Sequence, residues 1–120
     1  MEDFVLIFRG VVTDPEQQLS PQQMQAIMTE WQNWMGGIAA QNKLASSGYR
    51  LGTDMSTIKP GNVVTDGPYA EIKEMLSGLI VVKANSVAEA TEIGKGCPIL
   101  TIGGSVEVRS VIPMSMNYNK

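Results

Sequence analysis

Two unbroken apolar runs, rich in β-branched and aromatic residues, form the clearest pattern along the chain, at residues 4–8 and 79–82. Each run predicts a buried strand, and the second continues through Lys83 to Ala84. Residues 106–111 alternate between apolar and polar side chains, which predicts a further strand with two different faces. The chain therefore contains at least three strands that are widely separated in sequence.

Shorter segments predict a hairpin and one more extended piece. Residues 56–59 and 63–65 flank Pro60-Gly61-Asn62, whose proline and glycine are typical of a hairpin turn. Residues 49–51 follow Gly48 and predict a short strand.

Two helices are predicted by their start signals. Ser20, Pro21 and Gln23 combine a capping residue, a proline in the first helical position and a capping box. An apolar stripe with helical spacing follows and runs to about residue 44; its members are Met24, Ile27, Met28, Trp31, Trp34, Met35 and Ile38. Ser86 and Glu89 form a second capping box, which predicts a short helix from Val87 to about Gly94.

The order of these elements predicts an α+β fold, an antiparallel sheet with two helices on one face. A sheet with one solvated face should have alternating strands, yet residues 4–8 and 79–82 do not alternate. Something therefore covers the second face. We expect the sheet of a second copy, and hence a homodimer; the alternative is a helix end or a loop of the same chain.

Composition limits the chemistry that this single domain of 120 residues (1–120) can perform. There is no histidine, and Cys97 is the only cysteine. These counts exclude Ser-His-Asp and Cys-His nucleophile systems and a zinc site built from His and Cys, so we expect neither a metal nor a cofactor. Acid–base work would fall to carboxylates, to lysine and arginine, or to tyrosine. Cys97 is expected to be buried and inert.

The formal net charge of −3 and the dispersed basic residues argue against a nucleic-acid partner. No apolar stretch approaches the roughly 18 residues of a membrane span, so no membrane partner is expected. The start of the sequence has no basic region of the kind that opens a signal peptide. The cytoplasm is the expected location.

Strand geometry predicts one charged cluster. If Val106 and Val108 face the helices, Glu107 and Arg109 point to the opposite face of the sheet. Lys83 and Arg9 join them when their strands are oriented in the same way. Buried charges need partners or a ligand, so this face could form a net positive, mostly apolar cleft suited to a small organic anion. The alternative is an ordinary salt-bridge network at the rim of the sheet.

Residues 64–74 read Val-Thr-Asp-Gly-Pro-Tyr-Ala-Glu-Ile-Lys-Glu, and Ser-Gly-Leu at 77–79, Cys-Pro at 97–98 and Glu-Val-Arg at 107–109 follow. This pattern resembles the YCII-related family, specifically its DGPF branch, which is named for an Asp-Gly-Pro-Phe motif. Tyr69 stands here in place of the Phe. The resemblance covers essentially the whole chain and implies the ferredoxin-like dimeric α/β-barrel.

The same resemblance bears on catalysis. The YciI-type branch is suspected of enzymatic activity because of a recurrent His in the first helix and a recurrent Asp before a late Pro. Matching by residues 40–44 places Trp31 at the His position, and the late Asp-Pro falls on Cys97-Pro98. An acid–base mechanism of that kind therefore lacks its groups here, and whether the protein is an enzyme stays open. Some members of the family are linked with sigma factors, which implies a regulatory alternative.

The candidate site residues are few, and each also has a structural interpretation. Asp66 is the candidate catalytic residue, although an Asp before Gly-Pro is also a good turn residue. The candidate ligand-binding residues are Trp31, Asp66, Tyr69, Lys83, Glu107 and Arg109. Trp31, three residues before Trp34, also fits core packing or a dimer contact. We expect a protein that binds a small, possibly anionic, molecule; the alternatives are a lyase or isomerase with Asp66 or Glu107 as base, and a sigma-factor-associated module.

Overall fold

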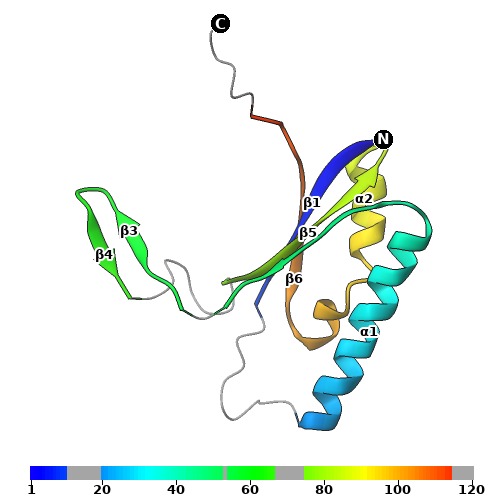
Figure 1. The fold of residues 1–120 in the computed structure, drawn as a ribbon, viewed down its shortest axis with the longest axis horizontal. Coiled ribbons are helices and arrows are strands. Elements are labelled where there is room, and N and C mark those ends of the chain that lie inside the picture. Colours follow the sequence, from blue (N-terminus) through cyan, green and yellow to red (C-terminus); the bar gives the residue numbers. More distant parts are fainter. Residues whose placement is uncertain (11–19, 53, 67–74, 115–120) are drawn as a thin grey trace, which may run out of the picture.

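The computed structural model describes residues 1–10, 20–52, 54–66 and 75–114. Its main sheet has four antiparallel strands in the order β2-β5-β1-β6. These strands are β1 (Glu2–Arg9), β2 (Leu44–Arg50), β5 (Leu76–Ala84) and β6 (Ser105–Ser110). The two apolar runs of the sequence thus form the central pair, which explains why they carry the strongest strand signal (Figure 1).

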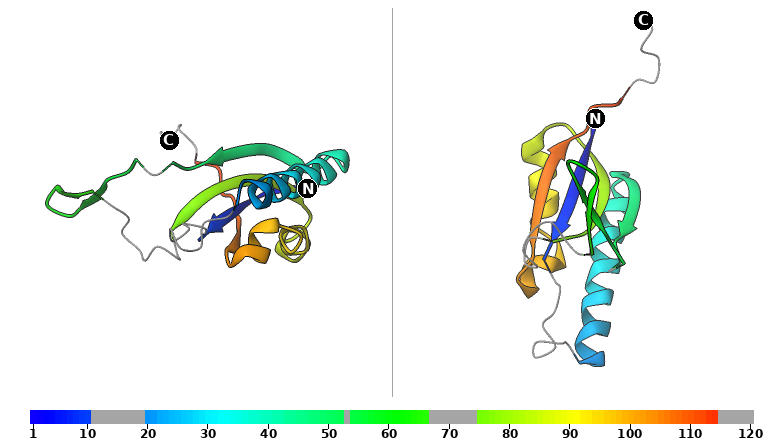
Figure 2. Two further views of the ribbon diagram at one scale, coloured as in Figure 1. Left: turned by 90° about the horizontal axis from the view of Figure 1, so that it is seen from below. Right: turned by 90° about the vertical axis from the view of Figure 1, so that its left-hand side faces the viewer.

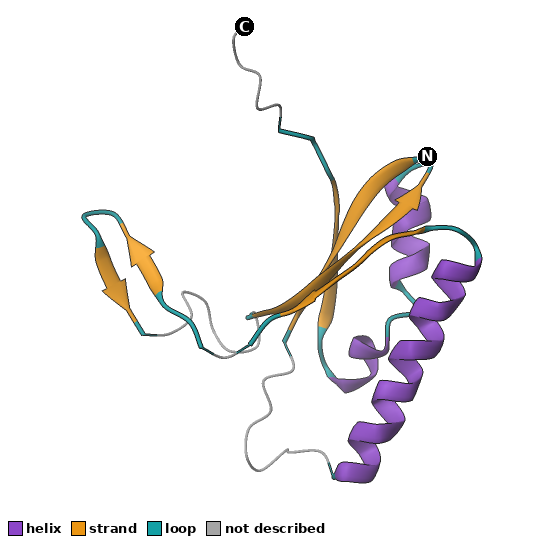
Figure 3. Cartoon of the chain, viewed as in Figure 1, coloured by secondary structure: helices purple, strands orange, loops and turns teal. Residues whose placement is uncertain are grey.

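Both helices of the described chain cover the same face of this sheet (Figures 2 and 3). They are α1 (Pro21–Ala40) and α2 (Val87–Gly94), and a short 3₁₀ helix, η3 (Pro98–Ile102), follows α2. The Ser20 hydroxyl accepts a hydrogen bond from the Gln23 amide, and the Gln23 side chain accepts one from the Ser20 amide. The predicted capping box is therefore confirmed, as is the α+β, ferredoxin-like architecture with two helices on one side.

The core lies between the sheet and the helices. Alternate residues of the central strands are buried there: Phe4, Leu6 and Phe8 from β1, and Ile80, Val82 and Ala84 from β5. Val106 and Val108 of β6 pack against this core. Leu6 lies opposite Ile80 in one strand pair and opposite Val108 in the other, so one register positions all three strands. The predicted helix-facing side of each strand is confirmed.

The end of the first helix differs from the prediction. The helix stops at Ala40 rather than near residue 44, because Asn42 adopts a left-handed backbone conformation (φ 62°) that ends the helical path. The Lys43 amide then donates back to the Ile38 carbonyl. Strand β2 begins immediately afterwards, at Leu44, and is longer than the predicted strand at 49–51.

The predicted hairpin is confirmed as a separate two-stranded sheet, β3 (Thr57–Lys59) paired with β4 (Val63–Thr65). Gly61 and Asn62 in its turn have positive φ angles, as tight turns between antiparallel strands require. We call residues 57–65 the β3–β4 arm. It lies away from the main sheet, on the side opposite to the helices (Figures 1 and 2).

The second side of the main sheet is only partly shielded. We call this side the open face; its central side chains are Val5 and Ile7 of β1 and Leu79 and Val81 of β5, all of them half-buried. A sheet face with this composition is unusual for contact with water. The sequence-based expectation of an apolar second face is therefore met, whereas the second copy that was expected to cover it stays a prediction.

Candidate functional site

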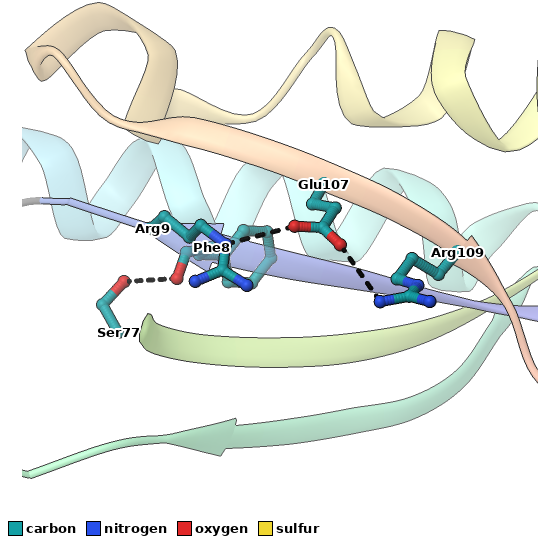
Figure 4. Close-up of polar contacts among 5 residues, drawn as sticks. All are labelled: Phe8, Arg9, Ser77, Glu107 and Arg109. Carbon is teal, nitrogen blue, oxygen red and sulfur yellow. Dashed lines mark hydrogen bonds and ion pairs between the residues drawn. The ribbon is translucent and has the colours of Figure 1, made fainter. Parts of the chain in front are cut away.

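One charged cluster lies on the open face, where β1 and β6 run side by side. Glu107 is opposite Ile7 in the strand register. Its carboxylate lies between two guanidinium groups, with Arg9 Nε at 3.2 Å from one oxygen and Arg109 Nη1 at 3.5 Å from the other (Figure 4). The alternation of β6 produces this arrangement, because Val106 and Val108 turn toward the helices and leave Glu107 and Arg109 on the other side.

In this cluster two arginines share the Glu107 carboxylate. The Glu107 and Arg9 side chains are partly shielded, whereas the Arg109 side chain is 67% exposed. Ion pairs with this much solvent contribute only about 0–1 kcal/mol each to stability. The arrangement therefore contributes little to folding, and it leaves an accessible guanidinium beside an aliphatic surface.

Lys83 lies on the same face, toward the other end of β1. Its ammonium group is 3.1 Å from a carboxylate oxygen of Asp3, the residue directly opposite in the strand pair. Asp3 and Arg9 are six residues apart on one strand, which corresponds to about 20 Å. The open face thus carries the Lys83–Asp3 ion pair at one end and the cluster of Arg9, Glu107 and Arg109 at the other.

Sequence reasoning did not single out Asp3. The signal was present, because Asp3 shares the alternation of Val5 and Ile7 and so belongs to the same side of β1. It could not be used without the register that sets Asp3 against Lys83. The pairing shows that part of the positive charge expected on this face is compensated within the chain.

Trp31 lies on the other side of the sheet. Its ring centroid is 4.9 Å from that of Phe8 and 5.6 Å from that of Trp34, in edge-to-face contacts. The Trp34 indole nitrogen in turn donates to the Ile93 carbonyl at 3.1 Å, which ties α1 to α2. These contacts are typical of core packing. The structure therefore does not bring Trp31 together with Glu107 and Arg109.

The remaining candidates are Asp66 and Tyr69. Asp66 follows the last residue of β4 and is exposed. Tyr69 lies outside the described residues. Of the six predicted ligand-binding residues, the structure thus groups Glu107 and Arg109, adds Arg9 to them, and places Lys83 further along the same face.

Cys97 is buried, as predicted, with 2% of its surface exposed. Burial raises the pKa of its thiol from the ordinary 9.0 to about 11, although a hydrogen bond with the Ile99 backbone opposes the shift. Cys97 directly precedes η3 as its N-cap residue, and a helix N-terminus favours the thiolate. Loss of solvation outweighs that location, so the thiol stays protonated near neutral pH.

The described residues include no group of three or more acidic or cysteine side chains placed to hold a metal ion. None of the helices in the described part of the chain combines the length and hydrophobicity that a transmembrane segment requires.

Comparison with known proteins gives one clear match. The model of the family described as the YCII-related domain matches residues 8–115, which is most of the chain. No curated protein matches the sequence. The matched range includes β2, β5, β6, both helices, the last two residues of β1 and the residues of the charged cluster.

Proposed function

We propose, given that the chain belongs to the YCII-related domain family, that it binds a small organic anion on the open face of its sheet, between two copies of the chain. The Asp66-Gly67-Pro68-Tyr69 sequence supports placing it in the DGPF branch of that family. The activity is binding, for sensing or as an accessory to another protein.

The observation that carries this proposal is the sharing of Glu107 by Arg9 and Arg109. A mostly exposed guanidinium that shares its carboxylate, as that of Arg109 does, keeps hydrogen-bond donors available. Arginine recognises planar carboxylates through two parallel hydrogen bonds. Arg109 projects from an edge strand of the sheet and is mostly exposed. An incoming carboxylate would pair with the exposed Arg109 guanidinium.

The neighbouring side chains indicate what the rest of the ligand looks like. Val5, which is opposite Arg109, and Ile7, which is opposite Glu107, extend the cluster into an aliphatic surface. A ligand with a carboxylate and an apolar body would satisfy both parts. Such binding sites are usually largely apolar, with a few well-placed polar groups.

A second copy would convert this surface into a cleft. Face-to-face sheets pack about 10 Å apart, with the side chains of their inner faces in contact. The half-buried aliphatic residues of the open face would then be removed from water, and the charged cluster would lie at the margin of the interface. Neither the lyase or isomerase alternative nor the sigma-factor alternative is favoured by a contact among the described residues.

The test is a thermal-shift panel of small aliphatic and aromatic carboxylates. A carboxylate present at ten times its Kd would stabilise the fold by about 1.4 kcal/mol, which raises the melting temperature by about 5 °C for a domain of this size. Arg109→Ala should weaken binding at least tenfold, because a hydrogen bond to a charged group is lost. Matched uncharged amides should give no shift.

The matched control is Lys95→Ala. Lys95 is also 67% exposed and ion-paired, with Glu92, but it lies on the helix side of the molecule. Both variants remove one positive charge, so a general electrostatic effect would weaken binding equally in the two. A panel in which no carboxylate stabilises the wild type contradicts the proposal. So does a panel in which Lys95→Ala loses as much carboxylate affinity as Arg109→Ala does.

A further inference from the structure

We propose that the β3–β4 arm of each copy packs against the second copy, so that the two chains hold each other by reciprocal clasps. This inference rests on the proposed function in that it requires the same dimer. It assigns an interaction surface to the face of the arm that carries Ile58 and Val64.

The arm is too small to be stable by itself. It consists of two strands of three residues each, and an isolated two-stranded hairpin is at best marginally stable in water. Ile58 and Val64 are directly opposite each other and project from the same face of the ribbon. They are 68% and 59% exposed. A ribbon that is ordered and yet shows its aliphatic pair to solvent is suited to packing against another surface.

The direction of the arm points to the second copy as that surface. The arm follows β2 and precedes β5, the two strands at one edge of the main sheet. From there it extends on the open-face side, away from both helices (Figures 1 and 2). Any molecule seated on the open face would therefore have the arm beside it, and a two-fold symmetric arrangement would give each copy one arm of the other.

The dimensions of the chain agree with an exchanged arm. The accessible surface is 8595 Å², whereas a compact monomer of 13.0 kDa would expose about 6,300 Å². The radius of gyration is 16.5 Å, compared with about 14 Å for a compact domain of this length. A standard interface buries about 800 Å² on each partner. The difference between the two surface areas is well above the area that one partner buries in a standard interface. Such a difference is expected for a chain that completes its fold by extensive pairing with another.

The first test follows the arm itself. Hydrogen exchange of the backbone amides of residues 57–65 is measured by mass spectrometry at protein concentrations above and below the dimer dissociation constant. If the arm packs on the second copy, its exchange accelerates at least tenfold on dilution, together with that of the open-face strands. An arm whose exchange is the same at both concentrations overturns the inference, even if the dimer itself dissociates.

The second test removes the aliphatic pair. Ile58→Ser combined with Val64→Ser should raise the dimer dissociation constant at least tenfold in analytical ultracentrifugation, with an unchanged circular dichroism spectrum of the main domain. Met24→Gln combined with Met28→Gln is the matched control, because it removes two exposed apolar side chains from α1 on the helix side. That control should dimerise as the wild type does.

The outcomes separate this inference from the proposed function. A double-serine variant that dimerises like the wild type overturns the clasp, while carboxylate-dependent stabilisation that requires Arg109 would still support anion binding. Concentration-dependent protection of the arm without any response to carboxylates supports the clasp and contradicts the binding proposal. A wild type that is monomeric at all concentrations overturns the clasp and the two-copy cleft together.

Discussion

Glu107 is the residue on which the character of the open face depends. It receives two arginines from the same side of the sheet, so it both orients their guanidinium groups and compensates part of their charge. The carboxylate of an anionic ligand would compete with it for the same donors. The Glu107 side chain therefore sets how strongly the cluster attracts a second carboxylate.

Glu107→Gln should accordingly increase anion affinity, by about threefold to tenfold, because the internal competitor loses its charge while both arginines remain. The cost in folding stability should be below about 1 kcal/mol, since the ion pairs are partly exposed. Isothermal titration with the best carboxylate of the panel measures the first effect, and urea unfolding measures the second. Weaker binding by Glu107→Gln would mean that the Glu107 carboxylate accepts a hydrogen bond from the ligand rather than competing with it.

Cys97 gives a prediction for alkaline pH. An acid whose pKa rises on folding favours the folded state while it is protonated, so this contribution is complete below about pH 9 and is lost as the pH rises through about 11. The loss amounts to about 2–3 kcal/mol. Urea unfolding of the wild type and of Cys97→Ala between pH 8 and pH 11 should show the decline in the wild type beyond that in the variant. Parallel pH profiles would contradict the burial of the thiol.

At the scale of elements, adding a methyl group should have opposite effects on stability at two glycines, one in α1 and one in β2. Gly36 lies inside α1, where an added Cβ would have no heavy atom within 4 Å. Gly48 lies in β2 with a φ of 66°, and a Cβ there would overlap the Leu79 carbonyl oxygen at 1.7 Å. The same chemical change is therefore tolerated in the helix and excluded in the strand.

Gly36→Ala should stabilise the protein by about 0.5–1 kcal/mol, through better helix propensity and a less flexible unfolded chain. Gly48→Ala should destabilise it by more than about 2 kcal/mol, because the backbone of β2 or β5 must move. Urea unfolding of the two variants measures both. A destabilising Gly36→Ala that also weakens the dimer would show that a second chain approaches the helix closely.

The elements that sequence predicts well are those with a local physical cause. The Ser20 cap, the central apolar strands and the turn at Pro60-Gly61-Asn62 each carry their own signal. The boundary between α1 and β2 does not, because residues 39–47, apart from Leu44, are small or polar and fit several conformations. There the structure is decided by pairing with β5, where the Lys83 amide donates to the Lys43 carbonyl. These two residues are 40 positions apart in the sequence, so a local pattern does not indicate their contact.

The residues of the candidate site also divide into those that a local pattern places and those that it does not. Glu107 and Arg109 could be placed on one face because strand alternation is strict. The neutralisation of Lys83 by Asp3 depends on the register of two strands, and Trp31 depends on how the helix packs against Phe8. Both are tertiary facts that no local pattern encodes.

The whole molecule has two layers, with helices on one side of the sheet and an aliphatic open face on the other (Figure 2). A third layer would complete it, and the proposed second copy supplies that layer by symmetry. The center of such an interface would be the aliphatic residues of β1 and β5, with the charged pairs toward its ends.

Val81→Lys should therefore make the protein monomeric, since a charge at the center of a sheet-to-sheet interface would be buried without a partner. Val87→Lys is the control, because Val87 is exposed at the start of α2 on the helix side. Light scattering after size-exclusion chromatography distinguishes the two. A Val81→Lys variant with the mass of the wild-type species would place the interface elsewhere.

The strand order also determines when β1 can pair with its neighbours during synthesis. β1 is synthesised early, yet its two neighbours are β5 and β6, which begin at Leu76 and Ser105. At about 5–20 residues per second, the ribosome takes on the order of 3–13 s to travel from Arg9 to Leu76. During that interval the apolar segment 4–8 has no strand to pair with and has the composition of an aggregation-prone segment. We therefore expect the yield of folded protein in a cell to depend on two rates. These are the rate at which the middle of the chain is translated and the rate at which nascent chains associate.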